Sequence, residues 1–137
     1  MKKTLTIFAV LMGLFLHGQV KQEETFTDLF KTGPHTVTKY KDGSIWIFFQ
    51  NAKYSTIIDT ESIEIGDDIE SAILFYQEIL NVLQSEEGTY ELSNGMSVHR
   101  GKSPIIILSS GDGPSDGYTY IGKYQCKKGI KKLSELQ

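Results

Sequence analysis

The chain has 137 residues, a single cysteine and a formal net charge of −3, with 17 acidic and 14 basic side chains. This length predicts one domain of ordinary size, and one cysteine excludes a scaffold of intrachain disulfides. The net negative charge argues against general nucleic-acid binding, because such proteins neutralise phosphates with basic side chains.

The first segment predicts a secretory signal peptide over residues 1–18. Lys2 and Lys3 supply a basic start, and an uncharged apolar run extends from Leu5 to Leu16. A secretory signal needs that order, with a small residue at the cut, which Gly18 supplies. The run is shorter than the roughly 20 residues of a membrane span, so an uncleaved anchor is a weaker interpretation. We therefore expect an exported protein, periplasmic or secreted, without stable membrane insertion after cleavage.

We expect residues 19–34 to form a mobile lead-in, a segment that precedes the folded domain, in which Asp28 begins a single helical turn. The domain itself is expected over 35–137. Residues 35–40 alternate, and residues 45–49 are apolar on both faces, which favours a central strand covered on both sides. Asp42-Gly43 between them predicts a tight hairpin. Further extended pieces are expected around Ile57 and around Ile63.

The clearest prediction is a helix over about 67–85. Asp67 and Glu70 have capping-box spacing, and Gly88 follows as a stop. Apolar residues recur inside the segment at offsets of three and four, which is the period of one helix face: Ile69, Ala72, Ile73, Tyr76, Ile79, Leu80 and Leu83. This helix is expected to pack on one face of a sheet.

Around Asn94-Gly95 the apolar pattern selects a three-residue loop, Ser93 to Gly95, because only that register gathers apolar residues on one face. Strands are then expected over 104–108 and 118–124, and a short C-terminal helix from Cys126 to Leu136. We find no internal repeat. The predicted fold class is α+β: a single, mostly antiparallel sheet of five to seven strands with the 67–85 helix on one face.

Charge is distributed unevenly along the chain. Residues 54–99 contain ten acids and no lysine or arginine, whereas residues 100–137 carry a net charge of +4. We interpret the acids on the predicted 67–85 helix as its solvent-exposed face. The alternative is that they dock a basic partner.

Candidate sites are few. The 109–117 loop, with Asp112 and Asp116, has a composition suited to calcium, but it lacks the later glutamate of an EF-hand loop, so a plain turn is favoured and ion binding stays open. His35 and His99, with Cys126, are too few ligands for an ordinary zinc site. We therefore assign no catalytic, cofactor-binding or metal-binding residue, and we expect no cofactor.

Two functions from different classes remain. The first is a small exported binding or inhibitory domain that engages a protein partner. The second is a small exported hydrolase with a site near His99 or Asp112, using a serine such as Ser109 or Ser110. We prefer the first, because no nucleophile motif is present. A contiguous apolar patch would favour binding, whereas a pocket that joins His99 to an acid and a serine would favour catalysis.

Overall fold

The computed structural model describes residues 26–52, 59–109 and 117–137. The extended piece expected around Ile57, and the 110–116 part of the predicted loop, lie outside them. Within the described ranges the chain forms these elements in order: β1 (Phe26–Thr32), β2 (His35–Tyr40), β3 (Ile45–Gln50), β4 (Thr60–Gly66), α2 (Ile69–Leu83), β5 (Gly88–Glu91), β6 (Ser97–Arg100), β7 (Ile106–Ser109), β8 (Tyr118–Ile121) and α3 (Lys123–Ser134).

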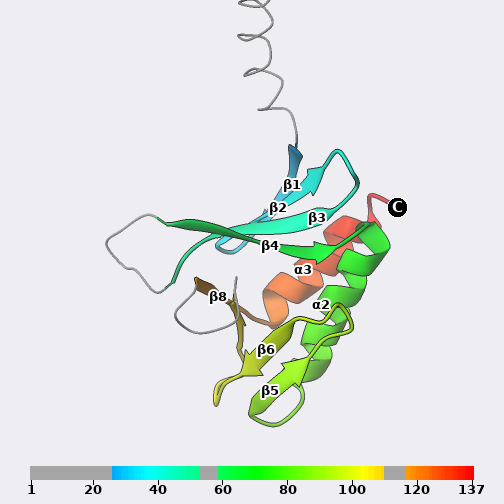
Figure 1. The fold of residues 1–137 in the computed structure, drawn as a ribbon. Coiled ribbons are helices and arrows are strands. Elements are labelled where there is room, and N and C mark those ends of the chain that lie inside the picture. The colour runs from blue at the N-terminus through cyan, green and yellow to red at the C-terminus, as the bar shows by residue number, and fades with distance from the viewer. Residues whose placement is uncertain (1–25, 53–58, 110–116) are drawn as a thin grey trace, which may run out of the picture.

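The strands form two four-stranded antiparallel sheets, so the prediction of a single sheet of five to seven strands is wrong. Sheet A has the order β1-β2-β3-β4, and sheet B has the order β5-β6-β7-β8 (Figure 1). Helix α2 follows β4 and precedes β5 in the chain, so it comes between the strands of sheet A and those of sheet B in sequence. Its buried residues lie on one face, and the helix contacts β4, β7 and α3. The α+β class is retained.

The two sheets share one topology, an antiparallel meander of four strands followed by a helix. The pattern β1 to β4 with α2 is repeated by β5 to β8 with α3, and the two helices pack side by side (Figure 1). The sequence carries no matching repeat, so the likeness lies in the order and pairing of the elements.

Strand β1 falls inside the range 19–34 that the sequence assigns to a lead-in. It pairs with β2 along its length, and a bulge shifts the register between Asp28 and Phe30. Because a bulge changes which side chains face which side of the sheet, Phe26 and Phe30 point to opposite faces although they are four residues apart. The bulge breaks the alternation that would have predicted this strand, and no helical turn forms at Asp28.

The Asp42-Gly43 hairpin and the Ser93–Gly95 loop are both confirmed. In each turn, the carbonyl of the residue before the loop accepts a hydrogen bond from the glycine amide. The amide of that same residue donates to the carbonyl of the residue after the loop. Gly43 and Gly95 have φ of +93° and +87°, the left-handed region in which glycine has no steric penalty. The two turns are therefore the same three-residue structure.

Helix α2 confirms the predicted helix, with a different cap. The carboxylate of Asp68, rather than Asp67, accepts a hydrogen bond of 2.8 Å from the Ser71 amide. Asp68 lies immediately before the first helical residue, the position from which a side chain reaches the free amides of the first turn. Helix α3 begins at Lys123, three residues earlier than predicted.

One apolar cluster joins both sheets to both helices. Polar contacts join the sheets where β3 ends: the Asn51 side chain accepts from the Tyr118 amide at 3.1 Å, and the Ala52 amide donates to the Tyr118 carbonyl at 2.8 Å. His35 of β2 and Thr119 of β8 form a further link between the sheets. The two sheets therefore belong to one packed unit, with the helix pair against the inner face of sheet A.

Candidate functional site

His99, the residue on which a hydrolase would depend, lies exposed on strand β6. Its Nδ1 is 3.3 Å from the Thr89 hydroxyl on β5. Ser109 ends β7, on the other side of β6, where its hydroxyl donates to the Gly117 carbonyl at 3.4 Å. The hydrogen bond of His99 is thus directed away from the strand that carries Ser109. Ser110, Asp112 and Asp116 lie outside the described residues.

His35 is buried in the core, 0% exposed, with Nε2 3.0 Å from the Thr119 hydroxyl. Its ring also meets Phe49 edge-on. Burial lowers the pKa of His35 to about 4, because a charged imidazolium is poorly solvated there. The ring is therefore neutral near pH 7 and acts as a packed core residue.

Cys126 and the terminal lysines are placed by α3. The thiol is buried, and burial raises its pKa to about 12, so it is an unreactive thiol that packs like a small apolar residue. Lys123, Lys127, Lys131 and Lys132 are exposed on the same helix, while Lys128 is half-buried. These lysines therefore form a solvated face of the helix.

The described residues also bear on metal binding and on membrane insertion. In 26–52, 59–109 and 117–137, no group of three or more histidine, cysteine or acidic side chains is placed to hold a metal ion. Neither described helix has the length and apolarity needed to cross a bilayer.

The most distinctive surface is a row of four stacked aromatic side chains on the outer face of sheet A, opposite the helices. We call it the aromatic row: Phe26, Tyr40, Trp46 and Phe48. Tyr40 stacks on Trp46 with ring centroids 5.3 Å apart, and Phe26 stacks on Tyr40 at 5.7 Å and on Phe48 at 5.9 Å. Phe26 is 40% exposed, and the other three rings are half-buried. No described helix covers this face.

Strand register explains why these four rings meet. Thr38 pairs with Trp46 and Thr36 with Phe48, so the even-numbered residues of β2 and β3 face outward together. Val37 and Ile47, one position away, face the core and are 0% exposed. Phe26 joins the row because it pairs with Tyr40 across the β1–β2 ladder.

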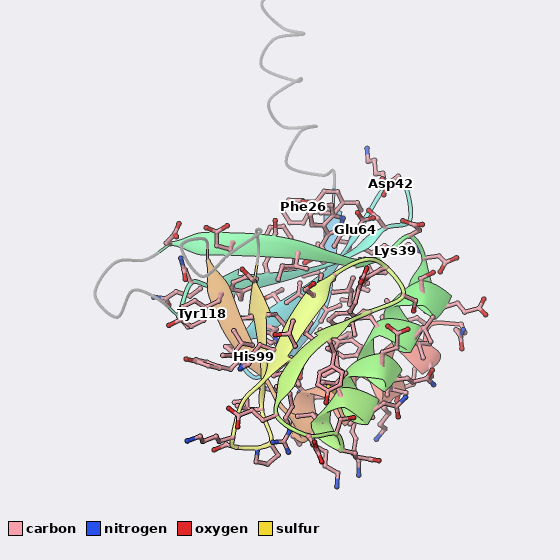
Figure 2. The ribbon with its side chains drawn as sticks, turned by 60° about the horizontal axis from the view of Figure 1, so that its bottom comes forward. Phe26, Lys39, Asp42, Glu64, His99 and Tyr118 are labelled. Carbon is pink, nitrogen blue, oxygen red and sulfur yellow. The ribbon has the colours of Figure 1, made fainter. Side chains whose placement is uncertain are left out.

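Carboxylates border the aromatic row at the end that carries Trp46. The Trp46 indole N–H donates to the Ser44 hydroxyl at 2.9 Å, and that hydroxyl donates to the Asp42 carboxylate at 2.6 Å. Glu64 pairs directly with Trp46 from β4, and Figure 2 shows Phe26, Asp42 and Glu64 gathered at one end of the molecule. Lys39 lies at this end too. Glu64 is exposed, but slight desolvation raises its pKa, and the charges of Asp67 and Asp42 raise it further.

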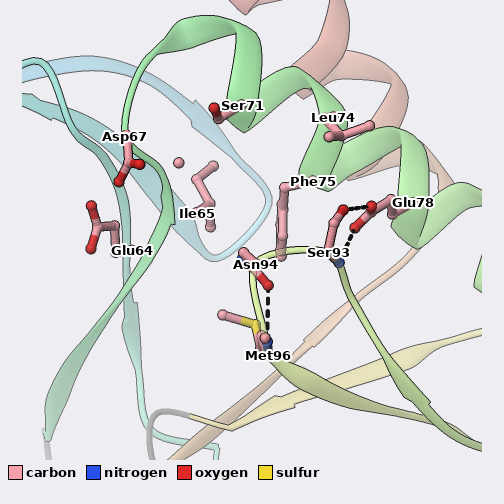
Figure 3. Close-up of a pocket in the computed structure, with 12 residues that line it drawn as sticks. Glu64, Ile65, Asp67, Ser71, Leu74, Phe75, Glu78, Ser93, Asn94 and Met96 are labelled. Atoms are coloured by element: carbon pink, nitrogen blue, oxygen red, sulfur yellow. Dashed lines mark hydrogen bonds between the residues drawn. The ribbon is translucent and has the colours of Figure 1, made fainter.

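A groove of about 580 Å³ opens beside Glu64, between the start of α2 and the Ser93–Gly95 loop. We call it the acidic groove. Ile65, Phe75 and Met96 supply apolar lining, and Glu64, Asp67 and Glu78 supply carboxylates (Figure 3). Glu78 holds the loop in place by accepting hydrogen bonds from the Ser93 amide, at 3.2 Å, and from the Ser93 hydroxyl.

Sequence reasoning missed the aromatic row. It read Ile45 to Phe49 as a strand covered on both sides, whereas Trp46 and Phe48 are shielded on the outer face by neighbouring rings. A signal was present: the odd positions 37, 45 and 47 are aliphatic, while the even positions 40, 46 and 48 are aromatic. Phe26 had no such signal, because the bulge in β1 conceals its register.

Comparison of the chain with models of protein families, with curated proteins and with solved structures finds no match.

Proposed function

We propose that this protein is an exported binding domain whose aromatic row docks a basic, extended segment of a partner protein. The observation that carries the proposal is the stack of Phe26, Tyr40, Trp46 and Phe48, which no described helix covers. Aromatic side chains bury large areas at low entropic cost, which is why they are enriched at protein interfaces.

Charge complementarity selects the basic segment. Asp42 and Glu64 border Trp46, and the pKa of Glu64 is raised in part by neighbouring carboxylates, a repulsion that a bound cation relieves. Lysine and arginine are also attracted to the faces of aromatic rings. The acidic stretch 54–99, which holds Glu64 and Asp67, strengthens the same preference through long-range attraction.

One contact weighs against the hydrolase alternative. His99 bonds to Thr89, on the side of β6 away from Ser109, so this contact gives no support to Ser109 as a nucleophile.

Trp46 is the only tryptophan of the chain, so its fluorescence reports directly on the aromatic row. The probes are three synthetic octapeptides in which threonine alternates with arginine, glutamine or glutamate. We expect a saturable change in emission with the arginine peptide, weakened by salt because exposed charges are screened. Tyr40→Thr and Phe48→Thr should each weaken binding about tenfold or more, equivalent to about 1.4 kcal/mol.

The matched control is Tyr120→Thr, which removes a ring that is 41% exposed on the outer face of sheet B. It should leave peptide affinity unchanged, and circular dichroism should confirm that all variants are folded. An equal response to the glutamate peptide, or no saturable response, would refute the proposal. A saturable response to a neutral oligosaccharide such as tetra-N-acetylchitotetraose, without one to the arginine peptide, would reassign the face to a glycan.

A further inference from the structure

The acidic groove has the two chemical features that a long cationic side chain needs. Its apolar lining includes Phe75, which is buried, and Met96, which is half-buried and has a flexible, polarisable side chain. Its acidic wall carries Glu64 and Asp67, one on β4 and one in the turn before α2 (Figure 3). Lysine and arginine lay a hydrocarbon stem on apolar surface while the charged head stays at the rim.

The lining supplies no positive charge of its own. Three carboxylates, those of Glu64, Asp67 and Glu78, line the groove, and none of its lining residues is lysine or arginine. Glu78 is already engaged by Ser93. The pair Glu64 and Asp67 is therefore the part of the wall best placed to meet a cation from outside.

The acidic groove and the aromatic row meet at one residue. Glu64 lines the groove and also pairs with Trp46 across the β3–β4 ladder. A segment lying on the aromatic row is thus adjacent to the groove at the Trp46 end.

We propose that the acidic groove receives one lysine or arginine side chain of the segment that docks on the aromatic row, with the stem against Phe75 and Met96 and the charged head at Glu64 and Asp67. This inference rests on the proposed function and deepens it, because it assigns one anchoring position of the partner to a specific place on this chain.

The test uses probes too small to span both surfaces. The ¹⁵N-labelled protein is titrated with N-acetyl-lysine amide, N-acetyl-arginine amide and, as an uncharged analogue, N-acetyl-norleucine amide. We expect saturable shifts from one or both cationic probes at the amides of Gly66, Ser71, Gly95 and Met96, and much weaker shifts with norleucine. The two cationic arms identify which head group is preferred.

Two variants test the assignment. The double variant Glu64→Gln with Asp67→Asn should weaken cationic binding at least fivefold, and Met96→Trp should abolish it by filling the groove while leaving the carboxylates in place. The matched control, Glu86→Gln with Glu91→Gln, removes two exposed acids outside the groove and should change nothing. Equal shifts with norleucine, shifts spread over all acidic surfaces, no binding, or binding unaffected by the first two variants would overturn the inference.

The two proposals fail separately. If the small probes leave the groove unperturbed while the arginine peptide still changes Trp46 emission, the aromatic row stands and the groove assignment falls. If the probes bind the groove and the peptide response is absent, the groove takes cations but the docking role of the aromatic row is lost.

Discussion

At the scale of single residues, two buried polar side chains show how the core tolerates groups that are not fully hydrogen-bonded. The Tyr76 hydroxyl and the His35 Nδ1 are buried and have no hydrogen-bond partner among the described residues. An unpaired buried polar group loses its hydration without compensation, at a cost of about 1–3 kcal/mol. The two side chains therefore contribute to stability through the packing of their rings. Each leads to a prediction about the sign of a change in the free energy of unfolding.

Tyr76→Phe removes the unpaired hydroxyl and keeps the ring. We expect the free energy of unfolding to stay the same or to rise by about 1 kcal/mol, because no protein hydrogen bond is lost. Urea unfolding measures it, with Tyr120→Phe on the exposed face as the control that should change little. A loss of stability above about 1 kcal/mol would mean that the hydroxyl has a partner in solution.

His35 should make stability fall as the solution is acidified. Its pKa is about 4 when folded and 6.5 in the reference state, so the unfolded chain binds the extra proton between these values. Burial of the neutral ring therefore costs no proton above pH 6.5. As the pH falls from 6.5 toward 4, the free energy of unfolding decreases, and the decrease reaches about 2 kcal/mol by pH 5. Urea midpoints at pH 7.5 and 5 measure it. His35→Gln should reduce this dependence, and His99→Gln should retain it.

At the scale of elements, the two helices fit closely where α3 crosses α2. A Cβ added at Gly129 would lie 2.5 Å from Cε2 of Tyr76, far inside contact distance. Both residues are buried, so neither side can move into solvent. The absence of a side chain at position 129 therefore sets how near the two helices approach.

Gly129→Ala tests this packing by the sign of its effect. In an exposed helix the substitution would stabilise by about 1 kcal/mol, through helix propensity alone. Here we expect destabilisation of about 1–3 kcal/mol, because the added methyl group overpacks the interface. The double variant with Tyr76→Leu should recover part of the loss in chemical denaturation. A stabilised single variant would contradict the close packing.

At the scale of the whole molecule, both sheets and both helices share one apolar cluster, and the polar links at Asn51 and His35 tie sheet A to sheet B. Such an arrangement should unfold as one cooperative unit. The helix pair packs against the inner face of sheet A, and neither described helix covers the outer face that carries the aromatic row.

Export is the prediction that concerns the chain as a whole. The basic start and apolar run of residues 1–18 lead us to expect a mature protein that begins at Gln19. Mass spectrometry of the protein recovered from the envelope or medium checks it. Recovery of the intact chain from Met1 in the cytoplasm would contradict export, and with it the setting proposed for the binding role.

Local patterns were sufficient for several elements of this fold. The helix over 69–83 follows from apolar spacing, and the two hairpins follow from Asp42-Gly43 and from the alternation around Asn94-Gly95. These features depend on interactions between residues close in sequence, namely helix periodicity, turn geometry and cross-strand register. The α+β class follows from them in turn.

Long-range packing decided the rest. The division into two sheets depends on which strands pair with which, and the pairing of β1 with β2 includes a bulge that hides its alternation. The aromatic row joins residues 26, 40, 46 and 48 through three strands, and the acidic groove joins β4, α2 and a distant loop. By itself the sequence determined which short segments are helix, strand or turn, because those preferences are local. Only the tertiary structure decided which faces are covered, because burial depends on what the rest of the chain places against each face.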